Sequence, residues 1–230
     1  MRINRFFTDN GIMSRRAADR AVTDGRVAIN ERVAVLGDQV EPGDRVTLDG
    51  RPVGQAAKKT VIIAYNKPVG VECTSDERVP HNIIRAVNHP ERVFHIGRLD
   101  KDSEGLILLT NMGDIVNKIL RARYFHEKEY IVDANGPVSK DAIRALSSGI
   151  ELEDGPTRPC VVERVAARRL RIVLTEGRNR QIRRMIAHVG LDVVRLRRIR
   201  IMNILLGDLP VGRWRDLDAR ESEQLMSLLS

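Results

Sequence analysis

Three carboxylates stand close together in one short segment, GRLDKDSEGLILLTNMGD, at residues 97–114: Asp100, Asp102 and Glu104. Carboxylates at alternate positions are typical of a calcium loop. A loop beginning at Asp100 would have Leu108 and Asn111 at its ninth and twelfth positions, where oxygen ligands are needed. The spacing therefore gives little support to a metal site, and the acidic side chains need another explanation.

Asp100 differs from its acidic neighbours in what precedes it. Asp102 and Ser103 are ordinary residues for a polar turn between two strands. Asp100 instead follows the alternating apolar sequence VFHIGRL, which predicts that it is held at the end of a strand beside Arg98. A carboxylate on a rigid element near arginines stays ionised and can serve as a nucleophile or a base.

The chain as a whole is basic, with 39 lysines and arginines against 31 acidic residues and a formal net charge of +8. This balance favours a polyanionic partner, and nucleic acid is the first expectation. Aromatic residues make up 3% of the chain, too few for the stacking sheets of some RNA-binding modules. Any aromatic residue that contacts RNA must then act singly.

Positive charge is concentrated in residues 160–200, which contain twelve arginines and three acidic residues. Arg180, Arg183 and Arg184 have the i, i+3, i+4 spacing of one helix face, while Ile182 and nearby apolar residues can turn inward. We expect this basic face to contact RNA phosphates.

The following segment, VVRLRRIRI, has apolar residues that change parity between Leu196 and Ile199. A change of parity within a strand exchanges the faces on which its side chains lie. The pattern predicts a β-bulge or bend at Arg197 and Arg198.

Several classes of protein lack support in the sequence. Cys73 and Cys160 are the only cysteines and are far apart, which fits a reducing cytoplasm. The five histidines show no zinc-binding spacing, and no nucleotide-phosphate loop or other cofactor fingerprint is present. No apolar run approaches the roughly 20 residues of a membrane span, and the N-terminal sequence MRINRFFTDNG lacks a signal-peptide apolar segment. We expect a cytoplasmic protein without a cofactor, a metal or a membrane contact.

The first 50 residues predict a small domain of their own. Two short helices over residues 2–24, the second capped by Ser14, precede short β-branched runs separated by turn signals. This order resembles the S4 RNA-binding domain, in which Arg15, Arg16 and Arg20 would face RNA. Residues 1–50 contain equal numbers of basic and acidic residues, so a positive surface there depends on arrangement.

The rest of the chain predicts an α+β domain. Residues 51–60, RPVGQAAKKT, have the mixed composition of a linker, and we place the second domain at 61–230. Its predicted strands and helices combine into a mixed, mostly antiparallel sheet with flanking helices. Strands are expected at 61–67, 92–96, 105–110, 129–133, 170–175 and 193–201, and helices at 113–122, 139–148, 179–189 and 218–229.

The segment at 97–114 resembles the catalytic-aspartate motif of the pseudouridine synthases that modify ribosomal RNA, in the RsuA/RluB/RluF branch. Further matching stretches occur in the same order along the chain: YNKPVGV at 65–71, HEKEYIV at 126–132, LTEGRNRQIRRM at 174–185 and LPVGRWRDL at 209–217. The resemblance covers essentially the whole chain. It is closest to the RluF type, which acts on large-subunit RNA.

The resemblance implies a role for each matching residue. Asp100 is the catalytic carboxylate, either attacking the ribose or removing a ribose proton, and Arg178 is the basic residue that pairs with it. Tyr130 stacks on uracil, and Leu174 closes the other side of the base. Arg98 fills the gap left when the uridine flips out of the RNA.

These residues predict a cofactor-independent, monomeric enzyme that isomerises a uridine of structured RNA, with 23S ribosomal RNA as the first candidate substrate and tRNA as another. Two alternatives remain open at this point. One is a non-catalytic RNA-binding or ribosome-assembly factor with the same fold. The other is a metal-dependent nuclease that uses Asp100 and Asp102.

Overall fold

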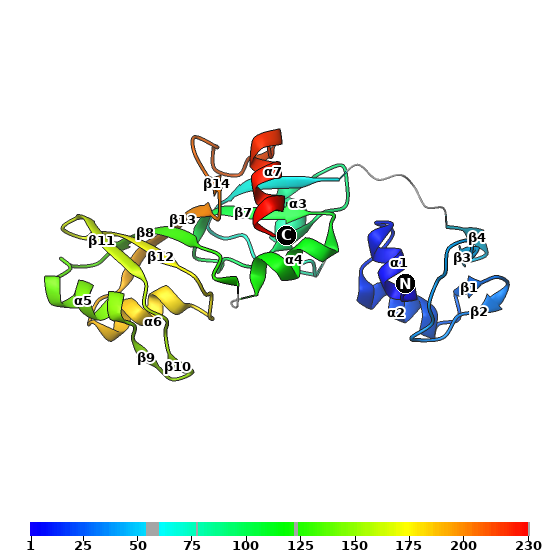
Figure 1. Cartoon of the computed structure of the whole chain (residues 1–230), viewed down its shortest axis with the longest axis horizontal. Helices are drawn as coiled ribbons and strands as arrows, with labels where there is room; N and C mark the ends of the chain where they lie inside the picture. Colours follow the sequence, from blue (N-terminus) through cyan, green and yellow to red (C-terminus); the bar gives the residue numbers. More distant parts are fainter. Residues whose placement is uncertain (54–59, 77, 122–123, 230) are drawn as a thin grey trace. The chain divides into compact units, whose positions relative to one another are not determined.

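The structure is a computed structural model that describes residues 1–53, 60–76, 78–121 and 124–229 (Figure 1). The chain divides into two compact units. The first comprises Met1–Thr60 with Asn111–Gly113, and the second comprises Val61–Thr110 and Asp114–Ser230. Each unit has its own hydrophobic core.

The first unit packs two helices, α1 (Ile3–Asp9) and α2 (Arg15–Thr23), with a small antiparallel sheet. Ser14 caps α2 as predicted, because its hydroxyl accepts a hydrogen bond from the Ala17 amide. The sheet has the order β2-β1-β3-β4, with strands β1 (Val27–Ile29), β2 (Arg32–Val33), β3 (Val46–Leu48) and β4 (Arg51–Pro52). Because β4 pairs with β3, the ordered unit extends past residue 50, where we expected the linker to begin. Residues 54–59 of that linker lie outside the described residues.

The second unit is built on a nine-stranded sheet with the path β11-β12-β8-β13-β7-β5-β15, in which β14 pairs with β13 and β6 with β7. Its strands are β5 (Ile62–Lys67), β6 (Phe94–Ile96), β7 (Glu104–Thr110), β8 (Lys128–Ala134), β11 (Val161–Ala166), β12 (Arg169–Leu174), β13 (Val193–Ile201), β14 (Ile204–Leu205) and β15 (Trp214–Asp216). Every pairing is antiparallel except that of β13 with β7. The predicted mixed, mostly antiparallel sheet is confirmed.

Helices and one hairpin surround this sheet (Figure 1). The hairpin joins β9 (Glu151–Leu152) to β10 (Gly155–Pro156). The helices are α3 (Ile83–Val87), α4 (Gly113–Leu120), α5 (Lys140–Ser148), α6 (Gln181–His188) and α7 (Ala219–Leu228). In α6 the predicted inward residues Ile182, Met185 and Ile186 are buried.

The predicted irregularity in β13 is also present. The register between β13 and β8 shifts between Arg198 and Arg200, next to the arginines at which the parity change predicted it. The neighbouring strand β7 lies so close there that a Cβ on Gly105 would stand 2.2 Å from the carbonyl oxygen of Arg198. Gly105 also has a φ of +103°, so both the space and the backbone conformation require glycine.

Candidate active site

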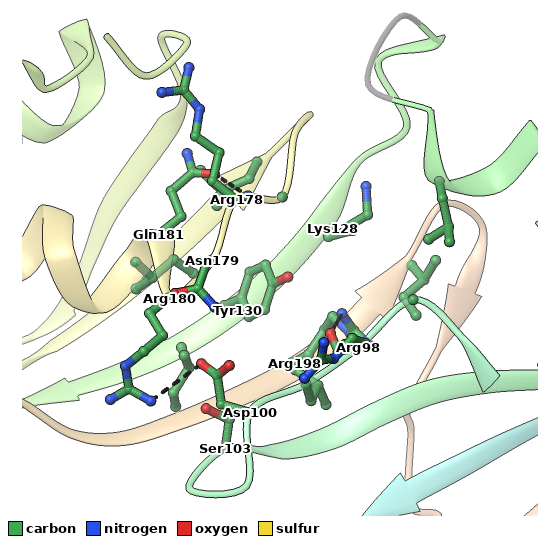
Figure 2. Close-up of a pocket in the computed structure, with 18 of the residues that line it drawn as sticks. Arg98, Asp100, Ser103, Lys128, Tyr130, Arg178, Asn179, Arg180, Gln181 and Arg198 are labelled. Carbon is green, nitrogen blue, oxygen red and sulfur yellow. Dashed lines mark hydrogen bonds and ion pairs between the residues drawn. The ribbon is translucent and has the colours of Figure 1, made fainter. Parts of the chain in front are cut away.

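A cleft of about 570 Å³ in the second unit brings together four residues that the sequence had singled out: Asp100, Tyr130, Leu174 and Arg178. They come from the loop before β7, from β8, from the end of β12 and from the segment before α6. Figure 2 shows Asp100, Tyr130 and Arg178 around the same space. Arg98 and Arg180 line the same cleft.

Asp100 lies in a loop, four residues after β6 ends at Ile96, and not at the end of a strand as predicted. The loop is nevertheless tied down. The Leu99 amide donates to the Sγ of Cys73 at 3.3 Å, and the Ser103 amide donates to the Asp100 carbonyl at 3.1 Å. The short strand β6 ends early because Gly97 turns the chain with a φ of +73°.

The charge beside Asp100 is Arg180. One terminal nitrogen of Arg180 lies 3.7 Å from the Asp100 carboxylate (Figure 2). The other lies 3.1 Å from Asp102. Arg183 also approaches Asp102, at 3.3 Å. Partial burial raises the pKa of Asp102, but the hydrogen bond from Arg180 and the charges of Arg183 and Arg180 outweigh it and leave that pKa below its usual value. Arg180 therefore links both carboxylates of the loop.

Arg178 does not make the ion pair with Asp100 that the resemblance implied. Its guanidinium donates to the carbonyl oxygens of Asp154, at 3.2 Å, of Gly155, at 2.7 Å, and of Pro156, all in the β9–β10 hairpin. Figure 2 shows the Arg178 side chain extending away from Asp100. In this structure Arg178 fastens the hairpin to the wall of the cleft.

The backbone conformation before α6 explains why Arg180, and not Arg178, lies beside Asp100. Arg180 has left-handed dihedrals, φ 48° and ψ 32°, and precedes the first residue of α6. The buried Gln181 accepts a hydrogen bond from the Arg178 amide and donates one to Glu176, which fixes the loop. The resemblance assigned the pairing with Asp100 to Arg178 and gave Arg180 a role in RNA binding. The left-handed backbone at Arg180 instead brings that arginine to Asp100.

Tyr130 and Leu174 are carried by neighbouring strands and are both buried. Tyr130 is 8% exposed and has its ring in the cleft, so it can cover one face of a planar base. Leu174 offers an apolar surface from the adjacent strand. An aromatic face, an apolar face and a carboxylate together can hold a nucleobase with its sugar near Asp100.

Two cations of the cleft were missed as site residues. Arg198 lies opposite Tyr130 in the β13–β8 pairing and is 4% exposed, with its guanidinium carbon 6.0 Å from the centre of the tyrosine ring. Lys128 begins β8, and burial with the nearby charge of Arg198 lowers its pKa to about 8. The parity change at Arg198 was the available signal, but it did not show which way the side chain points.

The predicted RNA-binding arginines lie in different surroundings. Arg15, Arg16 and Arg20 are exposed on α2 of the first unit, opposite its buried face. On and just before α6, Arg180 and Arg183 contact Asp102, and Arg184 pairs with Asp154 at 2.6 Å. Much of the local positive charge in this segment is thus balanced by carboxylates from other segments, which a count along the sequence does not reveal.

The acidic residues near Asp100, which suggested a nuclease, also form ion pairs with arginines. Asp102 pairs with Arg180 and Arg183, and Glu104 pairs with Arg195. Among the described residues, no three His, Cys, Asp or Glu side chains are grouped so that they could hold a metal ion. In the same part of the chain, no helix is long and apolar enough to cross a membrane.

Comparisons with known proteins show the family of this chain. The family model of RNA pseudouridylate synthases matches residues 61–188. A crystal structure of a pseudouridylate synthase superposes with a TM-score of 0.72 at 29% identity, covering 98% of this chain and 99% of that one. The chain therefore belongs to the RNA pseudouridine synthases, enzymes that isomerise uridine in RNA.

Among individual proteins, the dual-specificity RNA pseudouridine synthase RluF of Escherichia coli strain K12 is 47% identical over 230 residues, which are 100% of this chain and 79% of that protein. An RNA pseudouridine synthase of Aquifex aeolicus is 39% identical over 237 aligned residues, covering 98% of this chain and 93% of its own. The similarity to RluF extends through the first unit, beyond the residues matched by the family model.

Proposed function

We propose that this enzyme converts a uridine of 23S ribosomal RNA into pseudouridine with Asp100 as its catalytic carboxylate. The observation that carries the proposal is the convergence of Asp100, Tyr130 and Leu174 on one cleft. The matched family gives the reaction class, and the strong match to RluF favours a structured RNA substrate.

The reaction requires no redox change and no transferred group from outside the substrate. The bond between uracil N1 and ribose C1′ breaks, the uracil turns, and a bond forms between C5 and C1′. The C5 proton is lost and N1 gains a proton, so atoms and electrons balance. Asp100 serves either as the nucleophile on the ribose or as the base that removes a ribose proton.

Tyr130 and Leu174 would retain the uracil while it is detached. Tyr130 covers one face of the ring and Leu174 the other, which keeps the base within reach of the sugar. Arg180 orients the Asp100 carboxylate, the role that the resemblance gave to Arg178.

Access to the base requires the uridine to leave its stack in the RNA. We assign to Arg98 the role of filling the space that the base leaves, because Arg98 lines the cleft two residues before Asp100. The first unit would act as an S4-like docking module through the exposed Arg15, Arg16 and Arg20. The free cysteines Cys73 and Cys160 suit the expected cytoplasmic location, and we expect the enzyme to be a monomer.

Pseudouridine mapping of cellular RNA tests the proposal. In cells that lack this protein, we expect one or a few positions of 23S ribosomal RNA to remain uridine, and wild-type protein to restore them. tRNA is mapped in the same samples, because the E. coli relative is named a dual-specificity enzyme. Unchanged ribosomal RNA would reject the proposed substrate.

Two variants separate catalysis from RNA binding in the same assay. Asp100→Asn keeps the shape of the side chain and removes its charge, so we expect it to restore no site while still binding RNA. Lys140→Met changes an exposed residue at the start of α5 and should restore every site. Restoration by Asp100→Asn would reject Asp100 as the catalytic carboxylate.

A further inference from the structure

Three cations gather at the end of the cleft away from Arg180: Arg98, Lys128 and Arg198. Figure 2 shows them on the side toward which the Tyr130 hydroxyl points, whereas Asp100 and Arg180 lie on the other side. Within the described part of the chain, none of the three pairs with a carboxylate. A group of cations around a cleft, without a counter-charge, is suited to an anionic ligand.

Arg198 holds a fixed position with one donor group unused. Its Nε donates to the Leu106 carbonyl at 2.7 Å, and one terminal nitrogen donates to the Arg98 carbonyl at 3.4 Å. The other terminal nitrogen is buried and has no hydrogen-bond partner among the described residues. An unsatisfied buried donor costs about 1–3 kcal/mol, and more when it is charged, so a small displacement of this side chain that brings the nitrogen against a ligand oxygen would be favoured.

Lys128 lies nearby with its own charge partly suppressed. Its ammonium donates to the His126 carbonyl at 3.0 Å, which satisfies one of its three donors. Burial and the charge of Arg198 disfavour the protonated form and hold the pKa of Lys128 below its ordinary value. An anion placed between Lys128 and Arg198 would relieve both effects at once.

We propose that Lys128 and Arg198 form a subsite for a phosphate group of the nucleotide that enters the cleft. A phosphate offers several charged acceptor oxygens, which match one free arginine nitrogen and a lysine ammonium. The subsite would fix the nucleotide at the end opposite Asp100, so that the ribose lies between the two. This inference rests on the proposed function, because it takes the nucleotide beside Asp100 as its starting point.

The uracil carbonyl oxygens are the other acceptors that these cations could meet. Uridine and its monophosphates distinguish the two sources, because uridine has the carbonyl groups and lacks the phosphate. The experiment titrates the whole protein with uridine 5′-monophosphate, uridine 3′-monophosphate, uridine and inorganic phosphate. The NMR signal of the Lys128 ε-carbon, assigned by its loss in Lys128→Arg, reports both binding and the protonation of this side chain.

For the wild-type protein, we expect at least one monophosphate to bind about tenfold more tightly than uridine and to raise the pKa of Lys128. Lys128→Met should reduce this difference to about twofold or less. Lys128→Arg, which keeps the charge, and Lys140→Met, which makes the same change on an exposed helix, should preserve it.

Three results would overturn the subsite. One is that the wild type binds uridine and both monophosphates equally well, or binds neither monophosphate. Another is an undiminished preference for the monophosphate in Lys128→Met. The third is a pKa change at Lys128 that uridine alone reproduces, which would assign the cations to the base. These titrations measure binding and not isomerisation. The subsite can therefore fail while the proposed function holds, because the proposed function is tested separately by the activity of Asp100→Asn.

Discussion

At the Asp100 end of the cleft, each carboxylate of the loop has an arginine beside it, since Arg180 lies 3.7 Å from Asp100 and 3.1 Å from Asp102. At the other end, Lys128 and Arg198 stand near each other, and in the described part of the chain neither has a carboxylate partner. The first arrangement fixes the direction of a side chain that must act on a sugar. The second leaves attraction available for a ligand. The carboxylates that need a fixed orientation are thus paired with arginine, whereas the cations at the other end remain available to bind an anion.

The largest expected effect concerns Gly105, which packs closely against the backbone of Arg198. Gly105→Ala should lower the free energy of unfolding by about 4 kcal/mol or more, because the new Cβ would overlap the Arg198 backbone and the φ of +103° disfavours alanine. Chemical denaturation measures the change. Gly155→Ala is the matched control, since Gly155 has a φ of +94° with nothing within 4 Å, and it should cost only about 1–2 kcal/mol. Equal costs would show that the close approach of β7 and β13 is unimportant.

A second prediction separates the two arginines of the catalytic end. Arg180→Ala should lower the single-turnover rate by about tenfold to a hundredfold, because Asp100 would lose its orienting charge. Arg178→Ala should affect the β9–β10 hairpin first, which increased hydrogen exchange at Gly155 and its neighbours would reveal. If instead Arg178→Ala alone abolished the rate and left the hairpin protected, the pairing in the RNA-bound enzyme would be that implied by the family resemblance.

The smallest effect concerns pH at the cationic end. Lys128, with a pKa of about 8, is charged below that pH and loses its charge above it. The preference for uridine monophosphate over uridine should therefore fall by about fourfold to fivefold between pH 7 and pH 9. Burial lowers the pKa values of the neighbouring His95 and His126 from their ordinary value, which moves their titration further from the range between pH 7 and pH 9. Lys128→Arg should show a flat profile, and a slope equal to that of the wild type would contradict the assignment.

Local patterns in the sequence predicted much of the fold. The strand at Val193–Ile201 has the predicted ends. The helix at Lys140–Ser148 begins one residue later than predicted, and the helix at Ala219–Leu228 is one residue shorter at each end. Such elements follow from apolar periodicity and from caps such as Ser139 and Asp218. The meeting of Asp100 with Tyr130 came from family motifs and not from periodicity, because it depends on how distant strands pair.

The misassigned details share a physical cause. Whether Arg178 or Arg180 reaches Asp100 depends on the left-handed backbone at Arg180, which residue type does not dictate. Whether Arg198 lies in the cleft or in solvent depends on the bulge and on the adjacent Gly105. A count of charges along the sequence likewise does not show that Arg184 pairs with Asp154, which is 30 residues away in the sequence.

The central claim is that the ionised side chain of Asp100 carries out the chemistry. Its most direct test is a single-turnover measurement with RNA labelled with tritium at C5 of uridine, in which release of the label follows the isomerisation. Asp100→Asn should bind the RNA within about threefold of wild-type affinity and release label at least about a thousandfold more slowly. Release within tenfold of the wild-type rate would contradict the account.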